Sequence, residues 1–225
     1  MLEADLKTDA FVLRRTNYGE TDRILNLLTP EGKISCLAKG VRKEKSKLAG
    51  GIELFTLSAV VLHRSQKSDL ALLTSAKMKT FYQNLLVDLD RLSLASKIIK
   101  ELARVTDQID SPEFFSLLKQ SLEGLNSGLD LSLVETWFNF NLARVRGEQI
   151  NILSDTDGEK LQEDSRYVWN STEMALQKLP EGNIGAAEIK IIRLILVSPL
   201  ALVARIKSLE NHLDIINYIS KQSMI

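Results

Sequence analysis

Residues 10–47 have the sequence AFVLRRTNYGETDRILNLLTPEGKISCLAKGVRKEKSK. Short apolar runs separated by turn residues, as here, are typical of β-strands. Such runs lie at 10–15, 23–29, 33–38, 54–63 and 70–74. Asn17-Tyr18-Gly19 and Pro30-Glu31-Gly32 divide the first three, and the second of these is a Pro-x-Gly turn that can join antiparallel neighbours. Five short strands favour a small closed barrel such as an OB-fold.

After the fifth strand the apolar period becomes helical. Ser111-Pro112-Glu113 offers an N-cap, a proline at the first helical position and an acid in the first turn, and Gly128 stops this helix. A second apolar stripe, 134–145, is ended by Gly147 as a C-cap. Further helices are predicted at 81–89, 92–105, 172–179 and 186–221, the last broken or kinked at Pro199.

These patterns predict an α+β protein of two domains. A five-stranded OB-fold that binds nucleic acid is expected at 1–78, and an all-helical domain at 79–225. The polar stretch at about 148–170 interrupts the helical pattern, and a short hairpin or a mobile loop is expected there.

Charge is unevenly distributed along the chain. The 29 basic and 29 acidic side chains balance overall, but residues 1–80 carry 14 basic and 9 acidic ones and the remainder carries 15 and 20. A basic N-terminal part favours a polyanionic partner.

The single cysteine, Cys36, excludes an intrachain disulfide and a multi-cysteine metal site, and it fits a reducing, cytoplasmic compartment. Neither a membrane span nor a secretion signal is predicted, because charges and Pro199 interrupt the longest apolar run, 189–206.

The sharpest candidate for a functional site is KGVRKEKSK, residues 39–47, between the third and fourth predicted strands. It carries five basic residues and one acid, Glu44, and lacks hydrophobic periodicity, which predicts a flexible basic arm. The five are Lys39, Arg42, Lys43, Lys45 and Lys47. Lysine and arginine suit phosphate contacts because they displace condensed counterions without a fixed geometry. A solvated loop that only keeps the barrel soluble is the plain alternative.

Other residues could extend this basic surface. The candidates are Arg14, Arg15, Lys33, Arg64 and Lys67. OB-folds bind single strands by adding base-stacking aromatic residues to a basic groove. Tyr18 and Phe55 are the nearest aromatic residues in sequence, and packing in the core is the favoured role for both. We therefore expect sequence-tolerant binding dominated by the nucleic-acid backbone.

Catalysis is not expected, and neither is a cofactor. His63 and His212 are solitary, and the chain has no G-x-x-x-x-G-K-[ST] phosphate loop or G-x-G-x-x-G turn. Carboxylates at 155–164 could imitate a metal cluster, but they lack EF-hand spacing, so a solvated loop is favoured. They are Asp155, Asp157, Glu159, Glu163 and Asp164.

The stretch 10–47 resembles the N-terminal signature of the RecO family of DNA repair proteins. The matching elements, in order, are Val12-Leu13, Tyr18-Gly19-Glu20-Thr21-Asp22, Gly32-Lys33, Ala38-Lys39-Gly40-Val41-Arg42, Ser46-Lys47 and Glu53-Leu54-Phe55. Residues 95–102, 114–122 and 137–147 agree more loosely with the middle helices of that family.

This resemblance implies an N-terminal OB-fold, a helical domain and the role of a recombination mediator. Such a protein binds single- and double-stranded DNA, anneals complementary strands and, together with RecR, helps to load RecA onto DNA coated by single-stranded-DNA-binding protein. It implies association with the nucleoid and no nucleotide hydrolysis. The acidic tail of the coating protein would occupy a groove on the helical domain, for which Arg104, Arg144 and Arg146 are candidate contacts.

The chain departs from the family in one respect. Many members carry a four-cysteine zinc site just after the glycine that corresponds to Gly147, and no cysteine follows here. The hairpin scaffold is expected to persist without metal.

Three other functions stay open: a protein-interaction scaffold, which predicts no salt-sensitive DNA binding; a metal-dependent nuclease or phosphoesterase, which predicts strand cleavage; and an RNA-binding barrel, which predicts preference for RNA over DNA.

Overall fold

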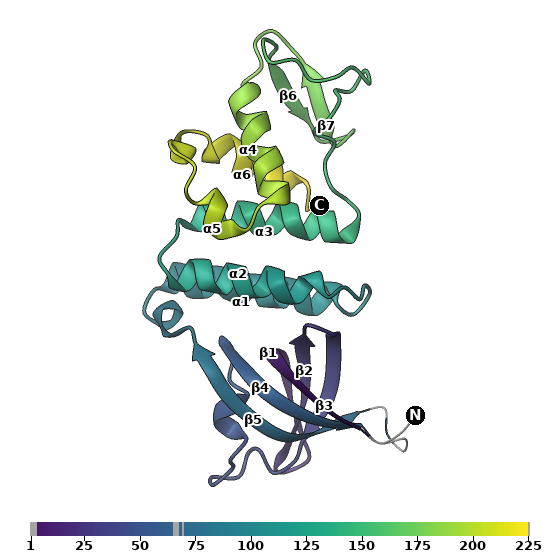
Figure 1. Ribbon diagram of the computed structural model, residues 1–225, viewed down its shortest axis with the longest axis vertical. Helices are drawn as coiled ribbons and strands as arrows, with labels where there is room; N and C mark the ends of the chain where they lie inside the picture. Colours follow the sequence, from purple (N-terminus) through teal and green to yellow (C-terminus); the bar gives the residue numbers. More distant parts are fainter. Residues whose placement is uncertain (1–3, 65–67, 69, 225) are drawn as a thin grey trace. The chain divides into compact units, whose positions relative to one another are not determined.

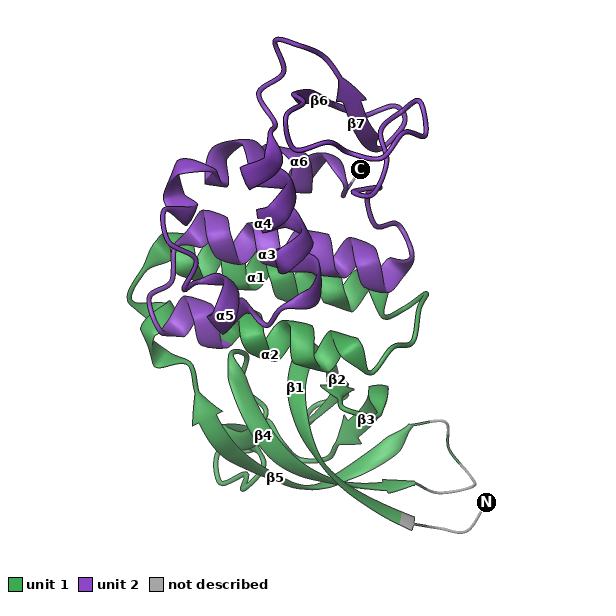
Figure 2. Cartoon of the chain, turned by 45° about the horizontal axis from the view of Figure 1, so that its top comes forward, with its two compact units in different colours: residues 1–122 green, residues 123–225 purple. Residues whose placement is uncertain are grey.

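A computed structural model describes residues 4–64, 68 and 70–224 of the chain (Figure 1). The chain divides into two compact units, residues 1–122 and residues 123–225, which are coloured separately in Figure 2. The first unit therefore combines the N-terminal strands with the helices that follow them. The domain boundary near residue 78 stays a prediction. Among the described residues, no helix combines the length and the apolar character needed to cross a membrane.

The first unit begins with a five-stranded barrel. Its strands are β1 (Ala4–Tyr18), β2 (Asp22–Thr29), β3 (Gly32–Ala38), β4 (Thr56–Arg64) and β5 (Ala71–Phe81). Their order, β1-β2-β3-β5-β4, closes on itself, with β3 and β5 parallel and all other neighbours antiparallel. The α+β class with an N-terminal five-stranded OB-fold is thereby confirmed, and each predicted strand overlaps an observed one.

The fifth strand is longer than predicted. It pairs with β4 as far as Phe81, which lies opposite Thr56. A helix at 81–89 was expected, but that prediction is wrong, since only a short 3-10 helix (Gln83–Leu86) follows the strand. The second half of β5 is mostly exposed, so its side chains add little to the barrel core. Backbone pairing with β4 holds it instead.

The barrel interior is filled by alternate residues of its strands. Leu25, Cys36 and Leu62 are each completely buried there. Val41 and Ile52, from the segment between β3 and β4, belong to the same core, so this segment is attached to the barrel at both ends. Each Å² of apolar surface that folding removes from water contributes about 25 cal/mol of free energy, and this contribution stabilises the core.

Burial also controls the chemistry of Cys36. It raises the pKa of the thiol to about 12, because the thiolate would lose its hydration. We expect no reaction of the folded protein with a thiol reagent at pH 8, and full reaction of one thiol once the protein is unfolded in denaturant. A colorimetric thiol assay tests this expectation, and rapid modification of the folded protein would contradict it.

Two helices complete the first unit. Helix α1 (Leu89–Val105) is N-capped by Asp88, whose side chain accepts hydrogen bonds from the backbone N–H groups of Asp90 and Arg91. Helix α2 (Glu113–Asn126) follows and crosses into the second unit. Phe11 of β1 contacts the rings of Tyr82 and Phe115, with centroids 6.3 and 5.3 Å away, and this aromatic cluster joins the barrel to α2.

The second unit is built on helix α3 (Leu131–Arg146), which Asp130 caps at its start and Gly147 ends in the left-handed conformation. Helices α4 (Ala186–Val197), α5 (Leu200–Val203) and α6 (Leu213–Gln222) follow, and both α4 and α6 pack against α3. Pro199 separates α4 from α5, as predicted.

A two-stranded hairpin interrupts the helices of the second unit, and a short hairpin was one of the two structures expected at about 148–170. Its strands are β6 (Tyr167–Asn170) and β7 (Ala175–Lys178). The helix predicted at 172–179 does not form, because Asn170 turns the chain and Met174 has a φ of 51°, which no helix accommodates. The predicted hairpin therefore lies further along the chain, with a hydrogen-bonded loop before it.

Candidate nucleic-acid interface

The basic loop, residues 39–47, leaves the end of β3 and is held against the turn between β1 and β2. The Gly40 N–H donates to Oδ1 of Asp22 at 2.7 Å, and the Arg42 N–H donates to the Thr21 carbonyl at 2.9 Å. Val41, only 3% exposed, is buried in the barrel core. The prediction of a flexible arm is therefore wrong for the first half of the loop, since the backbone there is fixed on both sides of Val41.

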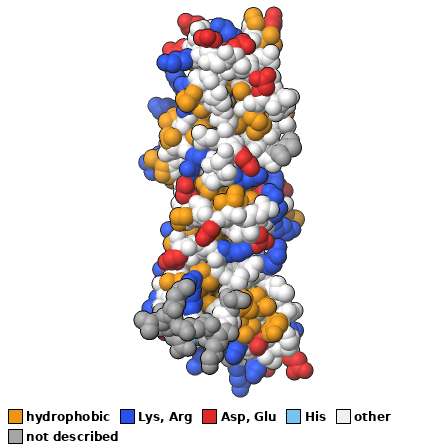
Figure 3. Space-filling view, turned by 90° about the vertical axis from the view of Figure 1, so that its right-hand side faces the viewer, with side chains coloured by type: hydrophobic (Ala, Val, Ile, Leu, Met, Phe, Trp, Pro, Cys, Tyr) orange, Lys and Arg blue, Asp and Glu red, His pale blue; other side chains and the backbone are white. Residues whose placement is uncertain are grey.

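All five cations of the basic loop point to solvent. None of Lys39, Arg42, Lys43, Lys45 and Lys47 forms an ion pair with another described residue, and Nη1 of Arg42 donates to the Gly19 carbonyl at 3.2 Å. On the face drawn in Figure 3, lysine and arginine side chains are scattered among acidic and apolar ones. Exposed, unpaired cations on an anchored backbone are well suited to phosphate contacts.

Asp22 fixes this loop through its charge. The Gly40 N–H and the Thr21 hydroxyl both donate to its carboxylate and lower its pKa, and the charges of Lys39 and Lys43 add to this effect. A carboxylate with a lowered folded-state pKa contributes stability above its unfolded pKa, and the contribution is lost as the pH falls through the folded value.

We therefore expect the backbone amide of Gly40 to keep its folded chemical shift until the pH falls below about 4, the ordinary pKa of an aspartate. An NMR titration of the amide resonances measures this directly. The N–H of Gly51, which donates to the backbone carbonyl of Leu48 at 3.1 Å, serves as a control. A Gly40 transition centred above pH 4 would contradict the role given to Asp22.

Two of the remaining predicted contacts, Lys33 and Arg15, form ion pairs within the protein. Lys33 forms an ion pair with Asp107, just after α1, and the pKa of Asp107 is lowered by the hydrogen bond and charge of Lys33 and further by Arg14. Lys33 and Lys39 stand at opposite ends of β3, about 20 Å apart at 3.3 Å per residue. Arg15 pairs with Glu53 at 2.7 Å. That Arg14, Arg15 and Lys33 bind DNA stays a prediction.

A shallow pocket of about 360 Å³ adjoins the start of the basic loop. Lys39 forms part of its wall, and Ile24, Leu37 and Leu72 lie side by side across its floor, since Leu37 is the register partner of both others. Tyr18 lines it as well and is 56% exposed, so the expected core role is wrong for Tyr18, whereas Phe55 is buried as expected. A pocket with an exposed ring beside cations suits an unstacked base.

Sequence reasoning missed this pocket, although a signal for it was present. Ile24 and Leu37 alternate with the buried positions of β2 and β3 and therefore project from the outer surface of the barrel. Apolar residues at such positions mark either a covered face or a binding surface. Arg64 is exposed at the end of β4, and Lys67 lies outside the described residues.

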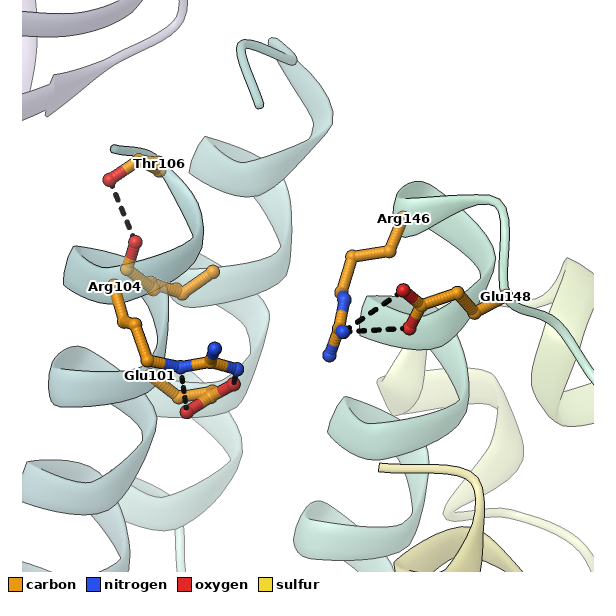
Figure 4. Close-up of polar contacts among 6 residues, drawn as sticks. Glu101, Arg104, Thr106, Arg146 and Glu148 are labelled. Carbon is orange, nitrogen blue, oxygen red and sulfur yellow. Dashed lines mark hydrogen bonds and ion pairs between the residues drawn. The ribbon is translucent and has the colours of Figure 1, made fainter. Parts of the chain in front are cut away.

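The three arginines predicted to bind a protein partner all lie near helix ends. Arg104 in α1 pairs with Glu101, and Arg146 at the end of α3 pairs with Glu148 at 2.8 Å (Figure 4). Arg144 is half-buried near the end of α3. Arg104 belongs to the first unit and the other two to the second. Their role in partner binding stays a prediction.

The candidates for other chemistry have local structural roles. Asp155 accepts hydrogen bonds from the backbone N–H groups of Asp157 and Glu159, and Glu163 pairs with Lys190 at 2.7 Å. Within the described ranges, no three His, Cys, Asp or Glu side chains are grouped so that they could hold a metal ion.

The two histidines each face one carboxylate. Nδ1 of His63 lies 2.9 Å from Asp5, and Nδ1 of His212 lies 2.6 Å from Glu188. Burial by itself would raise the pKa of Glu188, but hydrogen bonds from the Gly185 N–H and from His212 outweigh it and lower that pKa. The Glu188 carboxylate thus caps the first turn of α4.

Comparison with known proteins finds similarity in the N-terminal part of the chain. The family model described as "Recombination protein O N terminal" matches residues 1–82. A DNA repair protein RecO from Dehalococcoides mccartyi is 38% identical over 146 residues, which are 64% of this chain and 56% of that protein. Those from Roseiflexus and Alkaliphilus metalliredigens are each 32% identical, over 63% and 66% of this chain and 50% and 61% of their own length.

The aligned region thus spans little more than half the length of these relatives. The family model itself covers residues 1–82, which include the whole barrel with the basic loop. On these matches, residues 1–82 correspond to the N-terminal domain of the RecO family, and the chain is similar to DNA repair proteins RecO over about two thirds of its length.

Proposed function

We propose that this chain acts in DNA repair and recombination as a non-catalytic mediator that binds DNA through its barrel and anneals complementary strands. The observation that carries the proposal is the basic loop, where five cations are exposed without an ion-pair partner among the described residues and Asp22 and Val41 fix the first half of the backbone. Relatives named DNA repair protein RecO support it.

The annealing step follows from electrostatics. Two strands repel each other through their phosphates, and each phosphate contact with a lysine or arginine releases condensed counterions. A cluster of five cations lowers this repulsion where two backbones approach each other. Because lysine and arginine contacts to phosphates carry no sequence information, the protein would act on strands of any sequence.

The pocket beside Lys39 gives the single strand a second contact. A base displaced from its neighbours can lie against Tyr18 and the apolar floor, a contact worth about 1–3 kcal/mol per stacked base. A duplex keeps its bases stacked and gains only the phosphate contacts. We propose that the further partners are RecR, the acidic tail of single-stranded-DNA-binding protein and, indirectly, RecA.

Annealing of two complementary fluorescent oligonucleotides coated with single-stranded-DNA-binding protein tests the proposal. Addition of this protein without ATP is expected to accelerate duplex formation. The same assay with a Tyr18→Ala variant isolates the pocket, and this variant is expected to lose affinity for single strands but not for duplex. Absence of acceleration by the folded protein would instead favour an interaction scaffold, and preference for an RNA strand in competition would favour an RNA-binding barrel.

A further inference from the structure

Two turns in the second unit share one hydrogen-bond pattern. Oδ1 of Asn151 accepts from the backbone N–H groups of Leu153 and Ser154, at 3.0 and 3.2 Å. Oδ1 of Asn170 accepts from those of Thr172 and Glu173, at 3.0 and 3.1 Å. Each asparagine thus closes a turn over the next three residues, which is a common use of this side chain.

The spacing of these turns is that of a four-ligand metal site. Asn151 and Ser154 are separated by two residues, Ser154 and Asn170 by fifteen, and Asn170 and Glu173 by two. The pattern C-x₂-C-x₁₅₋₂₀-C-x₂-C, with the same intervals, is typical of zinc sites. The four positions 151, 154, 170 and 173 therefore correspond to the four ligand positions of a zinc ribbon.

The two turns also lie against each other. The Asn151 N–H donates to the carbonyl of Met174, the residue directly after the second turn, at 3.4 Å. Just beyond the first turn, the Thr156 N–H donates to the Leu176 carbonyl at 3.0 Å. Arg193 of α4 donates two hydrogen bonds to the Ile152 carbonyl, inside the first turn, at 3.2 and 2.9 Å. The scaffold that would bring four ligands together is therefore present.

The side chains at these positions do not fit zinc. Structural zinc sites use cysteine sulfur and histidine nitrogen, whereas the four positions hold two amides, one hydroxyl and one carboxylate. Both amide oxygens already accept two backbone N–H groups, and Nδ2 of Asn151 donates to Oγ of Ser154 at 2.8 Å. The zinc site that the family resemblance implies is thus replaced in this chain by hydrogen bonds.

We infer that residues 150–178 form a metal-free zinc-ribbon scaffold, in which Asn151 and Asn170 stand at the first ligand position of each pair and hold the turns that a metal would otherwise hold. The inference does not depend on DNA binding. Its structural consequence is that four cysteines at the four positions would restore a tetrahedral site for Zn²⁺, because the turns already have the required spacing and proximity.

The test uses the full chain with Asn151→Cys, Ser154→Cys, Asn170→Cys and Glu173→Cys, produced in the presence of zinc. One zinc per chain is expected, and the Co²⁺-exchanged protein should show the intense visible bands of tetrahedral four-sulfur coordination. A control variant carries four cysteines at exposed positions of the same region, Asp157, Asp164, Ser171 and Glu181. A folded test variant that binds no more zinc than this control overturns the inference.

A second measurement, the Tm of single variants, tests the native side chains. It is informative even if the four-cysteine variant does not fold. Asn170→Ala removes the acceptor of two backbone N–H groups and is expected to lower Tm by about 2–4 °C, the shift that corresponds to the loss of one cap. Thr172→Ala, in the same turn, is the matched control and should leave Tm unchanged. Equal Tm values for the two variants, or a fall in the Tm of the native chain upon addition of a chelator, overturn the inference.

Discussion

Replacement of the five cations of the basic loop by glutamine is expected to reduce the slope of log affinity against log salt for single-stranded DNA by about 3.5. The replaced residues are Lys39, Arg42, Lys43, Lys45 and Lys47. Each phosphate contact on a single strand contributes about 0.7 to that slope through counterion release. The measurement is a series of binding titrations by fluorescence anisotropy between low and high salt.

The fold of this variant should be retained. The loop backbone is held by the N–H groups of Gly40 and Arg42 and by Val41 in the core, and none of these contacts uses a side chain that the variant replaces. Circular dichroism and Tm provide the check.

A matched control separates the position of the charges from their number. Five other exposed lysines of the chain, Lys7, Lys77, Lys100, Lys160 and Lys207, are replaced by glutamine in the control variant. Its net charge equals that of the loop variant, so any long-range electrostatic effect is the same. We expect a clearly smaller change in its slope. Equal changes in the two variants would contradict the assignment of the loop and leave only a diffuse electrostatic attraction.

The barrel could be predicted from the sequence because its signals are local. Each predicted strand has apolar residues at alternate positions or a turn residue at its end, and Pro30-Glu31-Gly32 marks the β2–β3 turn. The end of β5 could not be predicted, because Lys77 and Lys79 are exposed and the strand there is defined only by its pairing with β4. Distant pairing of this kind leaves no local pattern.

The position of the hairpin in the second unit was predicted wrongly although a local signal for it was present. Residues 172–179 were predicted as a helix from their apolar spacing, but Asn170 and the positive φ of Met174 impose a turn. Side chains that bond to their own backbone compete with a helix, and the asparagine was the available signal.

The candidate site was only partly predictable for a similar reason. The cluster of cations at 39–47 is visible in the sequence, whereas the ion pair of Lys33 with Asp107 links residues 74 positions apart. No local pattern distinguishes an exposed lysine from one that faces a distant carboxylate. The same holds for the pocket, whose floor combines β2, β3 and β5.

Substitution of Phe11 by alanine is expected to lower the free energy of unfolding by about 3–5 kcal/mol. Phe11 is 2% exposed, and its ring contacts those of Tyr82 and Phe115. Its neighbours Ala10 and Val12 belong to the barrel core, so Phe11 projects from the other side of β1, toward the helices of the first unit. The substitution therefore leaves a cavity between the barrel and α2, and urea denaturation measures its cost.

Phe81→Ala is the matched control, because Phe81 is 41% exposed at the end of β5 and should cost about 1 kcal/mol or less. The shape of the Phe11→Ala transition also tests the division of the chain. If the barrel, α1 and α2 unfold as one unit, signals from the strands and from the helices of the first unit change together at the lowered midpoint. A barrel that instead melts separately from its helices would place a domain boundary near residue 78, and a cost near that of Phe81→Ala would contradict the structural role of the aromatic cluster.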